Sequence, residues 1–108
     1  MNDLNNTIDR INKFTSDRNW DQFHSPANLA KSISIEAAEL LECFQWNENN
    51  FDLEHVKEEL ADVLNYSIQL ASKLDLDLIK IINDKIDKNE KKYPIEKAFG
   101  KSNKYDEL

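Results

Sequence analysis

Four acidic residues stand out because they form two pairs with the same spacing. Glu36 and Glu39 are three residues apart, and so are Glu59 and Asp62. Residues with this spacing share one face of an α-helix, so each pair would present two carboxylates to the same side. The stretches around both pairs are rich in helix-forming residues. The sequence therefore predicts two helices that each carry a pair of carboxylates.

Both pairs point toward apolar surface. On a helical wheel of about 100° per residue, Glu36 and Glu39 fall on the apolar side of their helix. Glu59 and Asp62 border the apolar arc of theirs. A carboxylate held against a core must be neutralised, paired or bound to a cation. No basic residue shares these two faces, so we expect a bound metal ion.

Carboxylate oxygens are hard ligands, which favour Mg²⁺ or Mn²⁺ over Zn²⁺. Mg²⁺ commonly keeps part of its shell for waters and for the phosphates of a substrate. The four carboxylates therefore indicate phosphoryl chemistry on a phosphate-containing substrate.

A redox di-iron site is the main rival that the sequence itself can test. Helical di-iron proteins need two Glu-x-x-His motifs. The chain has two histidines, His24 and His55, and neither follows a glutamate by three residues. We therefore disfavour di-iron chemistry and expect both histidines to be loop or surface residues.

Helical periodicity covers most of the chain. One glycine and two prolines in 108 residues leave little turn chemistry for hairpins, so we expect an all-α fold. Ser25 and Pro26 form a typical helix start, and Pro94 stops the last long helix. The expected helices span residues 3–18, 26–46, 52–74 and about 76–92, followed by a polar tail at 95–108 that is at best partly ordered.

These four helices predict a subunit of the four-helix-bundle type, formed by a single domain over residues 1–108. The apolar surface of the second helix covers more than half of its circumference. A small monomer cannot bury that much, so we expect helices to pack across subunits in a homodimer or homotetramer.

The net charge of −7 argues against binding of nucleic acid polymers or of anionic membranes. No long apolar run or signal peptide is evident, which predicts a cytoplasmic protein without a membrane partner. The single cysteine, Cys43, lies among apolar positions and is expected to be a buried thiol.

Five further residues are candidates for contacts with a substrate. Trp20, Trp46 and Tyr66 are aromatic residues that would by default anchor a core, but Trp46 follows Glu39 on the same predicted helix face and could stack on a base. Lys85 borders an apolar stripe and could neutralise a phosphate, although such lysines usually reach solvent. Asn89 lies on the apolar arc and needs a polar partner.

Three stretches of the chain resemble one family. The segments EAAELLECFQW, EELADVLNYSIQLA and KIDKNEKKYP are similar to the MazG-like nucleotide pyrophosphohydrolases of the all-α NTP pyrophosphatase superfamily. The segments RNWDQFHSPANL and KYDEL extend the resemblance toward the single-domain dCTP pyrophosphatase branch. The resemblance covers nearly the whole chain.

The resemblance implies Mg²⁺-dependent hydrolysis of a (deoxy)nucleoside triphosphate, dCTP or a related dNTP, to the monophosphate and pyrophosphate. It implies helical dimers that pair into tetramers, with pockets built from more than one subunit. By position, the metal ligands and catalytic carboxylates would be Glu36, Glu39, Glu59 and Asp62. The substrate contacts would be Tyr66, Lys85 and Asn89 for phosphates or sugar, and Trp20 and Trp46 for the base.

Two departures from the family pattern concern the base. The link between Trp46 and Glu59 is shorter than in the dCTP pyrophosphatases, and the first helix offers only Ile8 and Ile11 where polar base-reading groups are expected. Three alternatives therefore stay open: a dimeric dUTPase-like or broad-range dNTP hydrolase, a non-catalytic nucleotide-binding module, and a plain helical oligomerisation domain.

Overall fold

The computed structural model describes residues 3–108, and every regular element in this range is helical. The expected all-α class is therefore confirmed. The chain divides into a first compact unit that ends at Leu76 and a second unit, Asp77–Leu108, and each is described by itself. No helix among the described residues is long and apolar enough to cross a membrane.

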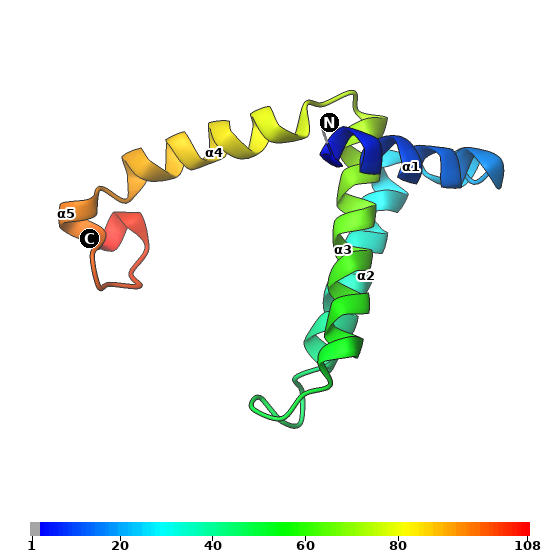
Figure 1. Cartoon of the computed structure of the whole chain (residues 1–108). Helices are drawn as coiled ribbons and strands as arrows, with labels where there is room; N and C mark the ends of the chain where they lie inside the picture. The colour runs from blue at the N-terminus through cyan, green and yellow to red at the C-terminus, as the bar shows by residue number, and fades with distance from the viewer. Residues whose placement is uncertain (1–2) are drawn as a thin grey trace. The chain divides into compact units, whose positions relative to one another are not determined.

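The first unit contains three long helices. Figure 1 shows α2 (Pro26–Glu42) and α3 (Leu53–Lys73) side by side along their lengths. α1 (Asp3–Asp17) crosses near one end of this pair and packs against α3. A short 3₁₀ helix, η1 (Asp21–Phe23), connects α1 to α2. We expected one subunit to contribute four helices to a bundle. Three of these helices belong to the first unit, and the fourth, at residues 78–92, belongs to the second unit.

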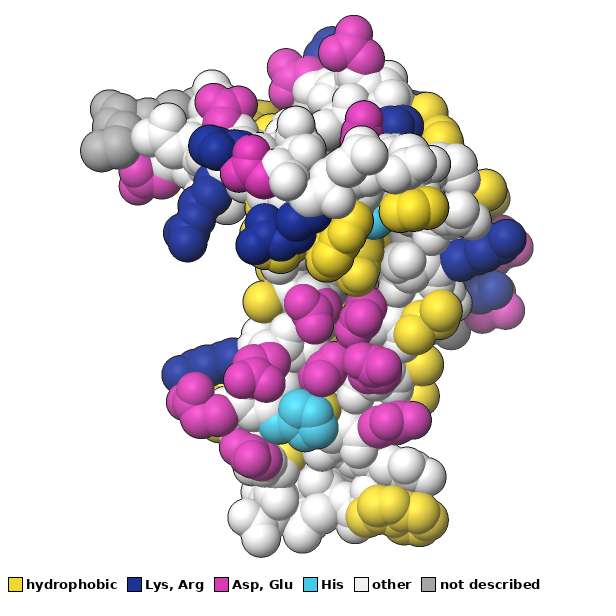
Figure 2. All heavy atoms as spheres, turned by 90° about the vertical axis from the view of Figure 1, so that its right-hand side faces the viewer, with side chains coloured by type: hydrophobic (Ala, Val, Ile, Leu, Met, Phe, Trp, Pro, Cys, Tyr) yellow, Lys and Arg dark blue, Asp and Glu magenta, His cyan; other side chains and the backbone are white. Residues whose placement is uncertain are grey.

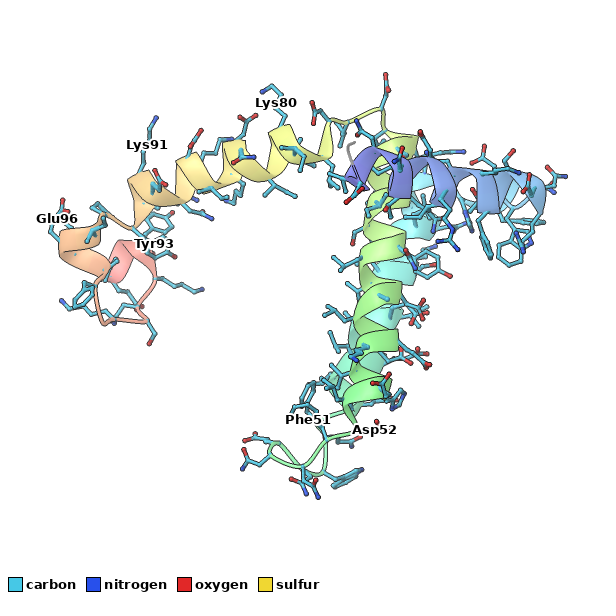
Figure 3. The ribbon with its side chains drawn as sticks, viewed as in Figure 1. Phe51, Asp52, Lys80, Lys91, Tyr93 and Glu96 are labelled. Carbon is cyan, nitrogen blue, oxygen red and sulfur yellow. The ribbon has the colours of Figure 1, made fainter. Side chains whose placement is uncertain are left out.

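Side-chain caps fix where two of these helices begin. The Ser25 hydroxyl accepts a hydrogen bond of 3.1 Å from the Asn28 backbone N–H, and Pro26 is the first helical residue, as the sequence predicts. The Asp52 carboxylate accepts a bond of 3.0 Å from the Glu54 N–H at the start of α3, where Figure 3 labels it. The two caps fix the first residues of α2 and α3.

The small core of the first unit lies where α1, α2 and α3 converge. Leu29 of α2 is 1% exposed, and Ala71 of α3 and Thr15 of α1 are also buried. The Thr15 hydroxyl donates to the Asn12 carbonyl at 2.9 Å, so its burial leaves this donor satisfied. This core holds the three helices at fixed positions around the site described below.

α2 ends earlier than the sequence predicts. We expected the helix to reach Trp46, but its last residue is Glu42, and Cys43, Phe44 and Gln45 continue in tighter turns. Their N–H groups bond to carbonyls three residues back, as at a typical fraying helix end. Trp46 therefore does not continue the helix face of Glu39, and its side chain is 89% exposed.

The second unit contains α4 (Leu78–Lys92), capped by the Asp77 carboxylate, and the short helices α5 (Ile95–Ala98) and η2 (Tyr105–Glu107). Lys80 and Lys91 project from the same side of α4 (Figure 3). The ring of Tyr105 packs edge-on against that of Tyr93, with centroids 6.3 Å apart. The polar tail predicted at 95–108 thus contains two short helices, and this aromatic contact brings the C-terminal segment back onto the end of α4.

Replacing Leu29 by alanine should lower the free energy of unfolding by about 2–5 kcal/mol, because it leaves a cavity in the best-buried part of the first unit. Urea denaturation followed by circular dichroism measures the change. The matched control, Lys31→Ala, alters an exposed position on the same helix and should change stability by less than about 0.5 kcal/mol. Equal effects of both variants would contradict this view of the core.

Candidate functional site

Carboxylates from α2 and α3 meet on one face of the first unit. One oxygen each from Glu36, Glu59 and Asp62 lies within 4.8 Å of the others, and all three side chains are half-buried. Figure 2 shows acidic side chains gathered across the middle of this face, beside hydrophobic side chains. The three residues come from two helices, so the α2–α3 packing brings them together.

Glu39 is the fourth member of this carboxylate cluster. Hydrogen bonding to Glu39 and the charge of Glu39 raise the pKa of both Glu36 and Glu59. The cluster therefore favours bound protons when no cation is present. Glu39 thus connects the α2 pair to the α3 pair.

Burial and mutual repulsion make these groups hard to ionise. Burial, the hydrogen bond to Glu39 and then the charges of Glu39, Asp62 and Glu59 raise the pKa of Glu36 from 4.5 to about 7. The hydrogen bond to Glu39, followed by burial, raises the pKa of Glu59. Such shifts are expected where like charges are crowded in a partly dehydrated place.

The cluster has the chemistry of a divalent metal site. Glu36 Oε2 and Glu59 Oε2 are buried and have no hydrogen-bond partner among residues 3–108. Buried carboxylate oxygens without partners are costly unless a cation satisfies them. The hard oxygen donors, their mutual distances and these two orphaned atoms all fit an ion such as Mg²⁺ or Mn²⁺.

His55 supports the cluster from one side. Its Nε2 lies 3.3 Å from Glu59 Oε1, while the other oxygen of Glu59 is the buried one without a partner. This contact holds the carboxylate in one orientation, with Oε2 left for the cluster. The expected surface position of His55 is correct, since its side chain is 54% exposed, but its contact with a candidate ligand was missed.

A cavity of about 410 Å³ adjoins the cluster through Asp62. One wall is a stripe of α3 residues spaced as one helix face, and the opposite wall is a similar stripe of α1. Trp20 and His24 close the cavity from the connecting segment. The α3 residues are Asp62, Asn65, Tyr66 and Gln69, and the α1 residues are Thr7, Arg10, Ile11, Phe14 and Thr15.

Aromatic rings line this cavity beside the acidic end. The Trp20 and Phe14 rings meet edge to face with centroids 5.7 Å apart, and His24 meets Tyr66 at 6.4 Å. Burial, and then the charges of Glu36, Asp62 and Glu39, raise the pKa of Tyr66, so its hydroxyl stays a hydrogen-bond donor. The cavity thus joins an anionic end to an aromatic wall.

A second cavity of about 350 Å³ lies on the other side of Thr15, His24 and Gln69, which line both cavities. Lys73 closes part of it by an ion pair of 3.3 Å with Asp21. The three shared side chains are the wall between the two spaces.

The structure brings together six of the nine residues singled out from the sequence. Trp20 and Tyr66 line the cavity that Asp62 joins to the other carboxylates. Trp46 lies in the exposed segment after α2, and Lys85 and Asn89 are exposed on α4 in the second unit. Their contacts with a substrate stay predictions.

Several cavity residues were not assigned to the site from the sequence, among them Arg10, His24, Asn65 and Gln69. The signal for two of them was present, because Asn65 and Gln69 follow Asp62 by three and seven residues and share its helix face. The first helix is also more polar here than expected, since Thr7 and Arg10 line the cavity together with Ile11.

The raised pKa of Glu36 predicts how metal-free protein responds to pH. Between pH 4.5 and about 7 the folded state binds more protons at Glu36 than the unfolded state, so the free energy of unfolding should fall as pH rises through this window. Glu36→Gln removes the ionisable group and should therefore stabilise the protein more at pH 8 than at pH 5. Urea denaturation in the presence of EDTA measures the free energy of unfolding at both pH values. Glu42→Gln, at an exposed position of α2, is the control. The same stability change for Glu36→Gln at both pH values would contradict the prediction.

Comparison with known proteins indicates the family of the chain. The model of the MazG-like family matches residues 31–108. Over 105 residues the chain is 36% identical to human dCTP pyrophosphatase 1 and 34% identical to the mouse protein, covering 89% of this chain. It spans 62% of the length of these relatives.

A solved structure is also similar. The crystal structure of a pyrophosphatase from Archaeoglobus fulgidus matches with a TM-score of 0.78 and 40% sequence identity. The match covers 87% of this chain and 94% of that one. Together with the family model, which matches well over half of the sequence, this similarity shows that the chain belongs to the MazG-like family.

Proposed function

We propose that this protein hydrolyses (deoxy)nucleoside triphosphates, with dCTP or a related dNTP as substrate, to the monophosphate and pyrophosphate. The observation that carries the proposal is the carboxylate cluster at one end of a cavity with an aromatic wall. Triphosphates need cations at one end and a stacking surface at the other, and a cavity of about 410 Å³ is of the size that holds small ligands. Relatives named dCTP pyrophosphatase support this choice of substrate.

The four carboxylates Glu36, Glu39, Glu59 and Asp62 would hold Mg²⁺, or Mn²⁺ in its place. When bound, the cation neutralises charge on the phosphates and makes the leaving pyrophosphate more stable. Without it, an anionic substrate would be repelled by the cluster. The half-buried setting strengthens this requirement, because charges are screened less there than in open solvent.

The chain itself would position the water and take its proton. The water oxygen forms a bond to the α-phosphorus, while the bond from that phosphorus to the bridging oxygen of the β-phosphate breaks. The water's proton passes to one of the four carboxylates, and the bridging oxygen leaves with pyrophosphate.

The aromatic residues would hold the nucleoside. Trp20 lines the cavity and offers a face for the base, and the Tyr66 hydroxyl would donate to the sugar or phosphates. Trp46 would add a second stacking surface for the base, as in the family pattern. Lys85 and Asn89 on α4 would contact the phosphates or sugar, as in the family pattern.

We further propose that the protein works as a homodimer or homotetramer. On α3, Leu53, Leu60 and Leu64 share one face and are 56%, 45% and 53% exposed. A continuous apolar stripe of this kind marks a surface that packs against another protein surface. A second copy of the chain offers the same stripe, so a two-fold interface would bury both.

Light scattering coupled to size exclusion should give a mass that is two or four times the 12.6 kDa of one chain. Leu64→Glu places a charge on the exposed stripe and should shift the mass toward that of one chain, because an unpaired charge in an apolar interface is costly. Circular dichroism must show the helices retained. A wild-type mass of 12.6 kDa would refute the oligomer.

Product analysis with each common dNTP and NTP tests the reaction. Monophosphate and pyrophosphate should form in the presence of Mg²⁺ and be absent in EDTA. Diphosphate and orthophosphate would show attack at a different phosphorus and refute the proposed reaction. Nucleotide binding without any product would indicate a non-catalytic binding module.

Glu39→Ala should lower kcat/KM by at least about a hundredfold, because it removes a group that connects the two carboxylate pairs. The fold should survive, since the cluster is a site of repulsion in the metal-free state. Glu42→Ala, one turn further along α2 and exposed, should retain activity. Full activity of Glu39→Ala would show that Glu39 is not part of the catalytic site.

A further inference from the structure

Arg10 lines the cavity, and its guanidinium has no hydrogen-bond or ion-pair partner within residues 3–108. Among the residues that line this cavity it is the one arginine or lysine. On α1, Lys13 pairs with Asp17 at 2.8 Å, and Arg18 donates to the Phe14 carbonyl at 3.1 Å. Arg10 has no such hydrogen bond or ion pair within residues 3–108. Its donors are therefore available to a ligand in the cavity.

The cavity has two chemically different regions. Asp62 connects it to the carboxylate cluster, where a cation and the phosphates would lie. The α1 side offers the apolar and aromatic side chains of Ile11 and Phe14, which Trp20 of the connecting segment extends, beside polar residues of the same helix. A base stacks on apolar and aromatic surface, so the α1 wall suits the base.

Arg10 belongs to the α1 region of the cavity. It directly precedes Ile11 and lies about one turn from Phe14 on the same helix face. From Asp62 the α3 wall runs on to Gln69, seven residues or about 10 Å along the helix, which is enough length to separate a base from its α-phosphate. The guanidinium thus lies beside the surface on which the base would stack.

The chemistry of a guanidinium selects one kind of base edge. Arginine has five N–H donors and no acceptor, so it pairs with two neighbouring acceptors. The O2 and N3 atoms of cytosine are both acceptors. In uracil and thymine the N3 position carries a hydrogen and is a donor, which would oppose an arginine N–H.

We propose that Arg10 reads the O2 and N3 edge of cytosine and so makes this protein prefer cytosine nucleotides over uracil and thymine nucleotides. The proposal rests on the proposed function for its substrate class. It assigns to a polar residue of α1 the base-reading role that the sequence alone did not reveal. The rival role for the same side chain is a charge contact with the phosphates, which would be blind to the base.

The test compares Arg10→Gln and Arg10→Lys with the wild type. Lysine keeps the charge but loses the planar pair of donors, so it separates base reading from phosphate contact. Lys13→Gln is the matched control, because it removes a charge from α1 at a residue that does not line the cavity. Two quantities are measured for each protein: kcat/KM for dCTP, dUTP, dTTP and dGTP, and the Kd of dCMP and dUMP by calorimetry.

We expect the ratio of kcat/KM for dCTP to that for dUTP to fall about tenfold in both Arg10 variants, and not in Lys13→Gln. The affinity for dCMP should fall by a similar factor while that for dUMP stays unchanged. Equal losses for all bases, restored by lysine, would show a phosphate contact and overturn the proposal. The proposal would also be overturned if the Arg10 variants left the ratio of kcat/KM for dCTP and dUTP unchanged, or if the wild type showed no preference for cytosine. A loss of kcat/KM confined to dGTP would overturn it as well.

The binding measurement separates this inference from the proposed reaction. Monophosphates are not substrates, so their affinities report on base reading even if the wild type hydrolyses no triphosphate. A cytosine-selective loss of dCMP affinity in an inactive protein would support Arg10 while refuting hydrolysis. If the wild type hydrolyses dNTPs but the Arg10 variants bind dCMP as tightly as the wild type does, the proposed reaction stands and the role of Arg10 is refuted.

Discussion

Four carboxylates held half-buried on two neighbouring helices repel one another, and the rest of the first unit depends on how that repulsion is contained. Glu36 and Glu39 face Glu59 and Asp62 because α2 and α3 pack side by side. Burial, hydrogen bonding to Glu39 and the neighbouring negative charges raise the pKa of Glu36 to about 7, so protonation reduces the charge in the absence of a cation. The same crowding that is costly in the empty cluster creates affinity for a divalent ion.

The surrounding structure keeps these groups in place by local means. A serine cap starts α2 and an aspartate cap starts α3, and the buried Leu29 and Ala71 lie between the helices. His55 adds a contact to one oxygen of Glu59 and leaves the other oriented toward the cluster. These contacts come from the chain itself and orient the carboxylates that would hold an ion.

The sequence predicts those features of the fold that depend on neighbouring residues within one helix. The all-α class, the Ser25–Pro26 start and the facing of the carboxylate pairs follow from periodicity and capping. The end of α2 could not be predicted, because tight turns and a continuing helix share the same apolar pattern through Trp46. The aromatic contact between Tyr93 and Tyr105 joins residues from two separate segments, which periodicity does not report.

The cavity illustrates the same limit. The α3 wall follows from helix spacing, since Asp62, Asn65, Tyr66 and Gln69 share a face. The opposite wall depends on how α1 crosses α3, and that crossing is set by the packing around Thr15. Arg10 was therefore not singled out from the sequence, while in the structure it lines the cavity that Asp62 connects to the acidic cluster.

Different helices supply the carboxylates and the surface suited to a base, and this separation affects how the sequence of such a protein can diverge. The carboxylates lie on α2 and α3, whereas much of the surface suited to a base belongs to α1, where Thr15 is the buried residue. Substitutions along α1 can thus reshape one wall of the cavity with little strain on the α2–α3 pairing. Descendants of one ancestral sequence could exchange one nucleotide preference for another by drift on a single helix, while the acidic cluster stays the same.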